Sequence, residues 1–256
     1  MSEAGRVAVV TGASRGLGLE LAKELAREGY RVGLLARTAE NLEKLAGEIR
    51  AGGGTAEFEA ADVAERQPTL DAIHRLAERL GPVDLLVANA GSGPETRLEP
   101  MNVEQVERMI RINLFGVIYS IEAVLPAMLA RGSGHLAAVS SLAAYKGFPG
   151  QAGYCASKAA VKTYMESLRI QLRHRGVAVT TICPGFIRTS MTEGHRFRMP
   201  GLMDADAAAR RVARALRRKK KVYNFPPFTE RLVKFTYWVP DWIMARATRG
   251  SYTESR

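Results

Sequence analysis

The sequence has few of the residues that indicate a secreted or a metal-binding protein. Of its 256 residues, only two are cysteines, Cys155 and Cys183, and four are histidines. The cysteines fall in segments with the patterns of a helix and a buried strand, so we expect reduced thiols rather than a disulfide framework. The histidines are scattered, with no pair at ligand spacing, and we expect no metal site.

The sequence also lacks long apolar runs, a leader and linkers. No eighteen consecutive apolar residues occur, which argues against a transmembrane helix. The first apolar segment begins at Val7 with no charged and apolar leader before it, so we expect no signal peptide and a cytoplasmic location. No repeat or low-complexity linker divides the chain, and its length suits one α/β domain.

Apolar runs of four to six residues alternate with amphipathic segments, which is typical of βαβ units. The pattern predicts a single α/β domain, a Rossmann-type doubly wound parallel sheet of about seven strands with helices on both faces. Strands are expected near 6–11, 31–36, 55–60, 83–88, 134–140, 177–183 and 221–224. Helices are expected near 16–28, 39–51, 65–80, 102–130 (with or without a bend), 153–175 and 204–218.

A glycine-rich turn, Thr11–Gly18, follows the first strand. Its spacing is Gly-x-x-x-Gly-x-Gly, which differs from the commoner Gly-x-Gly-x-x-Gly of dinucleotide sites. Gly12 can take the tight turn, Gly16 lets backbone approach a pyrophosphate, and Gly18 permits close packing of the next helix on the sheet. The amides at that helix start favour an anion. The turn therefore predicts a dinucleotide site, with a purely structural glycine turn as the alternative.

A second pattern joins Tyr154 and Lys158 with Ser141, which stands thirteen residues before Tyr154. In a helix over 153–175, Tyr154 and Lys158 lie on one face, one turn apart. A phenol titrates near about pH 10 in water, and we expect the Lys158 ammonium to lower that pKa. The alternative is a surface aromatic beside a solvated amine, because Tyr-x-x-x-Lys alone is common.

Further elements of the chain are Asn89-Ala90-Gly91, Asn113 and Pro184-Gly185. Together with the two patterns above, they resemble the short-chain dehydrogenase/reductase family over about residues 5–190. The resemblance implies an oxidoreductase that uses a nicotinamide dinucleotide and forms dimers or tetramers through the helices near 102–130 and 153–175. Ala88 stands where many relatives carry a second asparagine, a departure outside the catalytic set.

The resemblance implies four catalytic residues: Asn113, Ser141, Tyr154 and Lys158. Ser141 would hydrogen-bond the substrate oxygen, Tyr154 would donate a proton, and Lys158 would also hold the nicotinamide ribose. Asn113, inside an amphipathic helix, fits a bend and a water that feeds protons to Lys158, or is a plain surface asparagine. Ser140 is then a structural hydroxyl, since side chains alternate along an extended stretch.

The resemblance also implies the residues that contact the cofactor. Asp62 and Val63 would meet the adenine, although Asp62 could instead cap a strand end, and residues 184–189 would close on the nicotinamide. The full set is Gly12, Ser14, Arg15, Gly16, Leu17, Gly18, Arg37, Asp62, Val63, Asn89, Ala90, Gly91, Tyr154, Lys158, Pro184, Gly185, Ile187 and Thr189.

Two arginines narrow the cofactor to NADP(H). An acidic residue at the end of the second strand binds the adenosine ribose of NAD, whereas an arginine accommodates a 2′-phosphate. Here that strand runs into Arg37, no acid occurs before Glu40, and Arg15 precedes Gly16. Two guanidiniums can clamp one phosphate through charge-assisted bonds. Two solvated surface arginines are the alternative.

The loops beyond the strand ends predict the substrate class. They contribute Ser92, Gly93, Leu142, Ala143, Ala144, Phe148, Phe186 and Met191. This mostly apolar wall favours NADPH-dependent reduction of a hydrophobic ketone or aldehyde. The alternatives are an alcohol dehydrogenase working in the oxidative direction and a non-catalytic NADP-binding interaction protein. A pure binder has no need of Ser141, Tyr154 and Lys158 together, which argues against the last.

The net charge of +11 comes from one end of the chain. Residues 1–195, the predicted NADP-binding and catalytic part, hold 22 Lys/Arg against 21 Asp/Glu, whereas residues 196–256 hold 15 against 5. A basic cluster at Arg210–Lys221 is followed by aromatics that include Trp238 and Trp242. This extension predicts contact with an anionic membrane, an acidic carrier or an acyl chain. A lid or subunit contact is the alternative, and no nucleic-acid module is visible.

Overall fold

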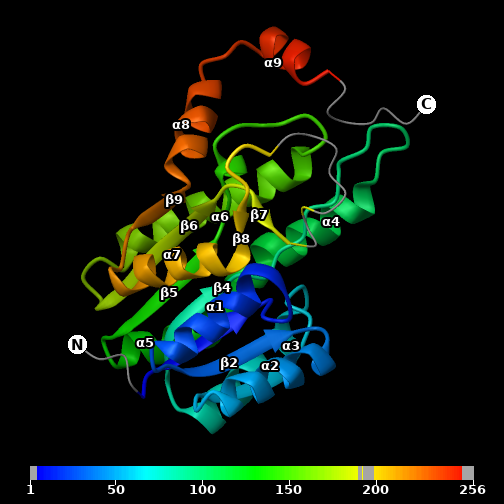
Figure 1. The fold of residues 1–256 in the computed structure, drawn as a ribbon. Helices are drawn as coiled ribbons and strands as arrows, with labels where there is room; N and C mark the ends of the chain where they lie inside the picture. Colours follow the sequence, from blue (N-terminus) through cyan, green and yellow to red (C-terminus); the bar gives the residue numbers. More distant parts are fainter. Residues whose placement is uncertain (1–4, 190–191, 193–198, 250–256) are drawn as a thin grey trace.

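Seven parallel strands form the central sheet, in the order β3-β2-β1-β4-β5-β6-β9 (Figure 1). The structure is a computed structural model that describes residues 5–189, 192 and 199–249. The strands are β1 (Val7–Thr11), β2 (Arg31–Ala36), β3 (Thr55–Ala60), β4 (Val83–Ala88), β5 (Gly134–Val139), β6 (Val177–Pro184) and β9 (Val222–Phe225). The predicted doubly wound parallel sheet is confirmed, and each strand begins and ends within a residue of its predicted range.

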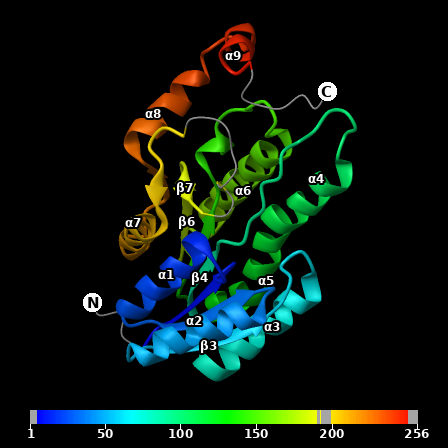
Figure 2. The same cartoon turned by 45° about the vertical axis from the view of Figure 1, so that its right-hand side comes forward.

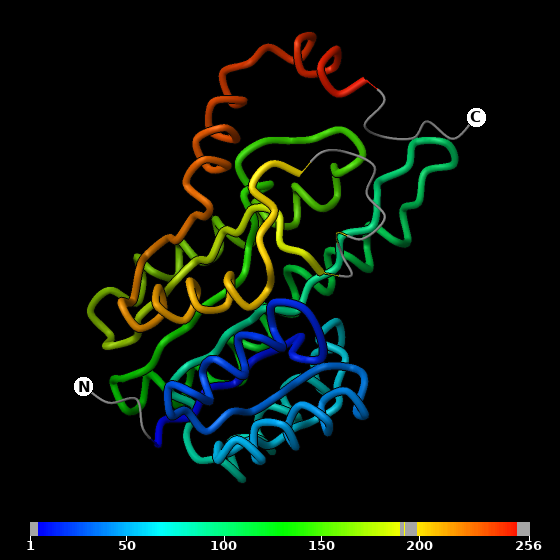
Figure 3. Tube along the Cα trace, in the orientation of Figure 1, coloured from blue at the N-terminus to red at the C-terminus, as the bar shows by residue number. Residues whose placement is uncertain are grey.

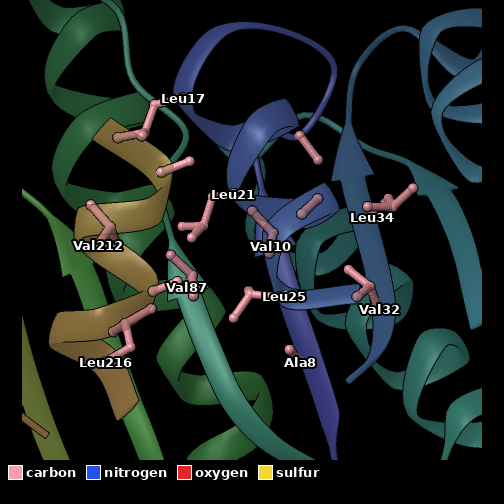
Figure 4. Close-up of a cluster of buried hydrophobic side chains, with 14 of the residues drawn as sticks. Ala8, Val10, Leu17, Leu21, Leu25, Val32, Leu34, Val87, Val212 and Leu216 are labelled. Carbon is pink, nitrogen blue, oxygen red and sulfur yellow. The ribbon is translucent and has the colours of Figure 1, made fainter. Parts of the chain in front are cut away.

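Helices cover both faces of this sheet (Figures 1 and 2). One face carries α1 (Gly16–Arg27), α2 (Ala39–Ala51) and α7 (Ala205–Arg217), and the other carries α3 (Arg66–Leu80), α5 (Gly116–Ala130) and α6 (Ala152–Gln171). Apolar residues four apart bury one stripe of each helix. In Figure 4, Leu21 and Leu25 of α1 lie with Val212 and Leu216 of α7 in one buried cluster that also includes Val10 of β1.

The long helix predicted over 102–130 is interrupted in its middle. It divides into α4 (Val103–Ile110), a π-helical turn η1 (Arg111–Phe115) and α5. The turn contains Asn113, the residue at which the sequence predicted a bend. Within the described residues, Val103–Ala130 is also the one helix long and apolar enough to cross a membrane, and 44% of its most apolar window is buried. Here it packs on the sheet and on α3 as a core helix.

The C-terminal part departs from the predicted elements. A short parallel pair, β7 (Ile187–Arg188) with β8 (Met203–Asp204), precedes α7, and two unpredicted helices follow β9, namely α8 (Pro227–Thr236) and α9 (Asp241–Ala247). Prolines occur at 226, 227 and 240. In the structure they stand at helix starts, where proline needs no amide partner.

The strand order reverses between β1 and β4, and this reversal places the site. In such sheets, ligands bind in the crevice beyond the carboxyl ends of the strands at the point of reversal. Helices α8 and α9 stand beyond the same strand ends, where the Cα trace carries them away from the sheet (Figure 3). The cavity in this crevice is bordered on one side by Thr229 and Val233 of α8.

Candidate active site

The carboxyl end of β4 is tied to the glycine turn after β1. The backbone amides of Asn89 and Ala90 both donate to Thr11 Oγ1, each at 3.1 Å. The Asn89 amide nitrogen donates to the carbonyls of Thr11 and Gly12 at 3.0 and 3.3 Å. Asn89 thus fixes the shape of the turn from the neighbouring strand.

The glycines of this turn leave no room for side chains. Gly12 has φ of +66°, and a Cβ there would lie 2.7 Å from the Cα of Ala90. A Cβ on Gly18 would clash with the carbonyl oxygen of Gly12, so Gly18 allows α1 to pack onto the turn as predicted. Helix α1 starts at Gly16 with no acidic residue in its first turn and no side-chain cap. Its first amides remain open to an anion.

Arg15 and Arg37 line the same cavity as this turn, and both are exposed. Across the described ranges neither guanidinium has an ion pair or a hydrogen bond, although sixteen other ion pairs occur there. Two unneutralised cations on one cavity wall form a positive rim that favours an anionic group. This arrangement is the one expected for a 2′-phosphate site.

Asp62 follows β3 and already has partners within the protein. Its Oδ1 accepts from the amide of Ala64 at 3.0 Å, and its Oδ2 pairs with Arg108 of α4. The strand-end cap that the sequence left as an alternative is therefore realised. Asp62 and Val63 still line the cavity, so their contact with an adenine stays a prediction.

Ser141, Tyr154 and Lys158 meet at the other end of the cavity. Ser141 follows β5, while Tyr154 and Lys158 stand one turn apart near the start of α6. The Lys158 ammonium lies 5.8 Å from the centroid of the Tyr154 ring and donates to the carbonyl of Val139 at 2.9 Å. Lys158 is buried, which excludes the solvated amine that was the alternative.

The ionisation of the pair differs from the sequence prediction. Burial raises the pKa of the Tyr154 phenol, and the hydrogen bond with Ser141 lowers that pKa by less. Burial also lowers the pKa of the Lys158 amine to about 8. The net pKa of the phenol is therefore raised rather than lowered, because burial dominates, and a lowering contribution from Lys158 stays a prediction. At neutral pH the phenol carries its proton, as a proton donor must.

Lys158→Met is expected to stabilise the fold at neutral pH. The folded pKa of about 8 lies below the unfolded value of about 10.4, so the native state binds this proton more weakly. The penalty is fully present below about pH 8 and disappears as the pH rises towards 10.4. The expected gain is about 1 to 3 kcal/mol after the lost hydrogen bond to Val139 is deducted.

Urea unfolding at about pH 7 and about pH 10 measures this effect. Lys162→Met, one turn further along α6 and more exposed, is the matched control. An equal stability difference for Lys158→Met at both pH values would show that the buried charge carries no penalty.

Asn113 is fully buried, so the surface asparagine of the alternative interpretation is wrong. Its Nδ2 donates to the carbonyl of Ser92 and to Ser157 Oγ, both at 2.9 Å, and its Oδ1 accepts from the amide of Ser92 at 2.8 Å. Asn113 thereby anchors the loop after β4 to α6. A Cβ on Gly91 would lie 3.5 Å from Asn113 Oδ1 and 3.3 Å from Lys158 Nζ, which places both groups beside Gly91. The proton relay through water stays a prediction.

Ser140 is the structural hydroxyl that strand alternation predicts. Its Oγ donates to the backbone carbonyl of Lys158 at 2.7 Å, and the residue is buried. The Ser141 hydroxyl instead accepts from the amide of Ala143 at 3.1 Å and faces Tyr154. Of the two neighbours, Ser141 alone is placed to meet a substrate oxygen.

The end of β6 and the segment after it border the cavity. Pro184, Gly185, Ile187 and Thr189 all line it, as do Ser14 and Leu17. The amide of Gly185 donates to the carbonyl of Phe225 at 2.7 Å, and the Thr192 hydroxyl donates to the carbonyl of Ile187 at 2.9 Å. Every predicted cofactor residue therefore borders one cavity, while their binding roles stay predictions.

This cavity has a volume of about 1360 Å³ and extends past Tyr154 to residues that the sequence predicted for the substrate wall. Six residues of the predicted wall line the cavity, namely Ser92, Gly93, Leu142, Ala143, Phe148 and Phe186. Ala144 does not line it and was wrongly included, while Met191 lies outside the described residues. Met199, Thr229 and Val233 also line the cavity and were missed. The last two could not be foreseen, because no helix was predicted over 227–236.

The fold and the site together define a class, the oxidoreductases that use a nicotinamide dinucleotide. The chain belongs to the short chain dehydrogenase family, whose family model matches residues 6–198. It is 43% identical over 221 residues to an uncharacterized oxidoreductase of Myxococcus xanthus, a match that covers 86% of this chain and 87% of that protein.

Two solved structures show the same likeness. An alcohol dehydrogenase from Thermococcus sibiricus, complexed with 5-hydroxy-NADP, is 31% identical with a TM-score of 0.77, covering 86% of this chain and 94% of that one. A variant of actinorhodin polyketide ketoreductase with NADPH is 28% identical with a TM-score of 0.79, covering 88% of this chain and 96% of that one. The oxidoreductase family predicted from the motifs is confirmed.

Proposed function

We propose that this protein is an NADPH-dependent reductase of a lipophilic ketone or aldehyde. The observation that carries the proposal is the arrangement of one cavity, with Arg15 and Arg37 at one end and Ser141, Tyr154 and Lys158 at the other. The first end suits a phosphorylated adenosine ribose and the second suits proton transfer to a carbonyl oxygen.

The residues present fit NADP(H). The glycine turn leaves backbone amides exposed where a Cβ would otherwise fill the space, as a pyrophosphate requires. The guanidiniums of Arg15 and Arg37, which have no partner among the described residues, supply charge for a 2′-phosphate. Solved relatives with 5-hydroxy-NADP and with NADPH support the same choice.

The bound cofactor would supply a hydride to the carbonyl carbon. The residues of the chain supply the proton and the orientation. Ser141 would donate a hydrogen bond to the carbonyl oxygen, and Tyr154 would give its proton to that oxygen as negative charge develops on it. Lys158, held by the carbonyl of Val139, would place its ammonium beside the resulting phenolate and favour it.

The substrate class follows from the cavity beyond Tyr154. Leu142, Phe148, Phe186 and Val233 border it, so apolar surface of a substrate would leave water there. The neutral phenol at physiological pH favours the reductive direction over alcohol oxidation, which needs a base. The homo-oligomer through α5 and α6 and the cytoplasmic location stay predictions.

A screen of ketones and aldehydes with NADPH absorbance as the readout tests the proposal. We expect turnover to rise with the apolar area of the substrate, and slower reaction of the matching alcohols with NADP⁺ at neutral pH. NADPH binding without turnover of any carbonyl would favour the non-catalytic alternative. Faster oxidation than reduction at neutral pH would favour the alcohol dehydrogenase.

A further inference from the structure

Helices α8 and α9 form an arm, Pro227–Ala247, that presents large apolar side chains to solvent. Trp238 is 82% exposed, Trp242 is 71% exposed and Phe235 is 67% exposed. In both ribbon views the arm stands beyond the carboxyl ends of the strands (Figures 1 and 2). Exposed aromatics gathered on one projecting element indicate a contact surface rather than part of the core.

The arm has two different sides. Phe228, Leu232 and Phe235 stand at i, i+4 and i+7 of α8 and form one exposed apolar stripe. Thr229 and Val233, on another side of the same helix, line the catalytic cavity. Helix α8 therefore carries the exposed apolar stripe on one side and part of the cavity wall on another side.

Polar contacts hold the arm against the catalytic body. Glu230 accepts from Asn224 of β9 and from Lys234, both at 2.7 Å. The Tyr145 hydroxyl donates to Asn224 at 3.2 Å, and Lys146 pairs with Asp241 of α9 at 3.4 Å. The contacts of the arm itself are made by Glu230, Lys234 and Asp241, so they leave the exposed apolar stripe uncovered.

The basic and aromatic parts of the C-terminal sequence separate in space. The basic cluster Arg210–Lys221 occupies α7 and the turn before β9, whereas the arm follows β9. The two therefore lie at opposite ends of strand β9 (Figure 1). The basic cluster and the aromatic residues of the arm therefore lie on different elements, and a joint contact of both with one partner stays a prediction. The positive charges beside the aromatics are instead those of Arg231, Lys234, Arg246 and Arg249, against Glu230 and Asp241.

From this geometry we infer that the arm docks on an anionic lipid membrane. Tryptophan and tyrosine favour the boundary between apolar and aqueous phases, and flanking arginines and lysines are attracted to anionic headgroups. A second copy of the chain is the competing occupant, and the oligomeric mass measured below tests it. Docking by the arm brings the cavity wall at Thr229 and Val233 close to the lipid, where lipophilic compounds concentrate.

The chain carries its own reporter for this contact. Its only two tryptophans, Trp238 and Trp242, are both in the arm. Added to vesicles of phosphatidylcholine with phosphatidylglycerol, the full-length protein should show a blue shift of tryptophan emission and quenching by brominated acyl chains. Unchanged emission at low salt with these vesicles would overturn the inference.

Vesicle sedimentation identifies the surface responsible. The double variant Trp238→Ser, Trp242→Ser should partition into anionic vesicles at least about tenfold more weakly, because interfacial binding scales with the apolar area buried. Ile170→Ser removes an equally exposed apolar residue from the far end of α6 and should change nothing. Added salt should weaken binding only in part, since the aromatic contribution is not screened.

Two further results would contradict the inference. The triple variant Arg211→Gln, Arg218→Gln, Lys221→Gln removes three charges from the basic cluster, and loss of binding in it alone would assign the contact to that cluster. The double tryptophan variant could also change its oligomeric mass and still bind vesicles. That result would show that the arm is a subunit interface. The NADPH affinity of every variant is measured as well. We expect it to stay unchanged, which would show that each protein is folded.

Discussion

Tyr154→Phe is expected to lower kcat by about a hundredfold to ten-thousandfold, the range for loss of a general acid. The substituted ring keeps its volume and its packing in α6 and loses only the hydroxyl that faces Ser141. NADPH affinity should stay within about twofold of the unmodified protein, because the phosphate and adenosine contacts lie at the other end of the cavity.

Tyr145→Phe is the matched control for this substitution. Tyr145 also carries a half-buried phenol near the site, but its hydroxyl donates to Asn224 and it does not line the cavity. Its variant should keep most of its turnover. If Tyr154→Phe kept kcat near that of Tyr145→Phe on the same ketone, another group would have to donate the proton.

Arg37→Asp is expected to weaken NADPH binding by about a hundredfold while NADH binding changes by no more than about threefold. The substitution removes one of the two unpaired guanidiniums on the cavity wall and places a carboxylate at the end of β2. A carboxylate repels a 2′-phosphate and accepts hydrogen bonds from a ribose diol. The ratio of the two dissociation constants should therefore fall or reverse.

Arg211→Asp makes the same change of charge on the exposed side of α7, outside the cavity. It controls for a general loss of positive field and should leave the NADPH to NADH ratio unchanged. Equal affinity of the unmodified protein for the two reduced cofactors would contradict the assignment of Arg15 and Arg37. If Arg37→Asp and Arg211→Asp weakened NADPH binding equally, the effect would come from long-range electrostatics rather than from contact with the 2′-phosphate.

Much of the fold followed from the sequence because local pattern and tertiary environment agree in the sheet. All five residues of β1 are buried, and four apolar residues followed by Thr11 before a glycine turn are typical of a buried parallel strand. The glycines were equally predictable, since Gly12 and Gly18 stand where a Cβ would meet backbone. Where a Cβ would clash with backbone, glycine is the residue that fits, so the constraint can be seen in the sequence.

Three features were not predictable, each because it depends on the tertiary environment. The partner of Asp62 is Arg108, 46 residues away, and no local signal joins them. The raised pKa of Tyr154 depends on burial that only the assembled cavity creates. Helices α8 and α9 are short and begin at prolines, and no element was predicted beyond residue 224. Their position then separated the aromatic residues from the basic cluster that precedes them in the chain.

The most direct test of the central claim follows a deuterium atom from the cofactor to the product. The protein is mixed with a hydrophobic ketone that it turns over and with NADPH deuterated at the transferable position, and the alcohol is analysed by mass spectrometry. The account predicts one deuterium on the carbinol carbon in the unmodified protein and almost no alcohol with Tyr154→Phe. Unlabelled alcohol, or equal yields of labelled alcohol from both proteins, would contradict hydride transfer from NADPH with Tyr154 as the proton donor.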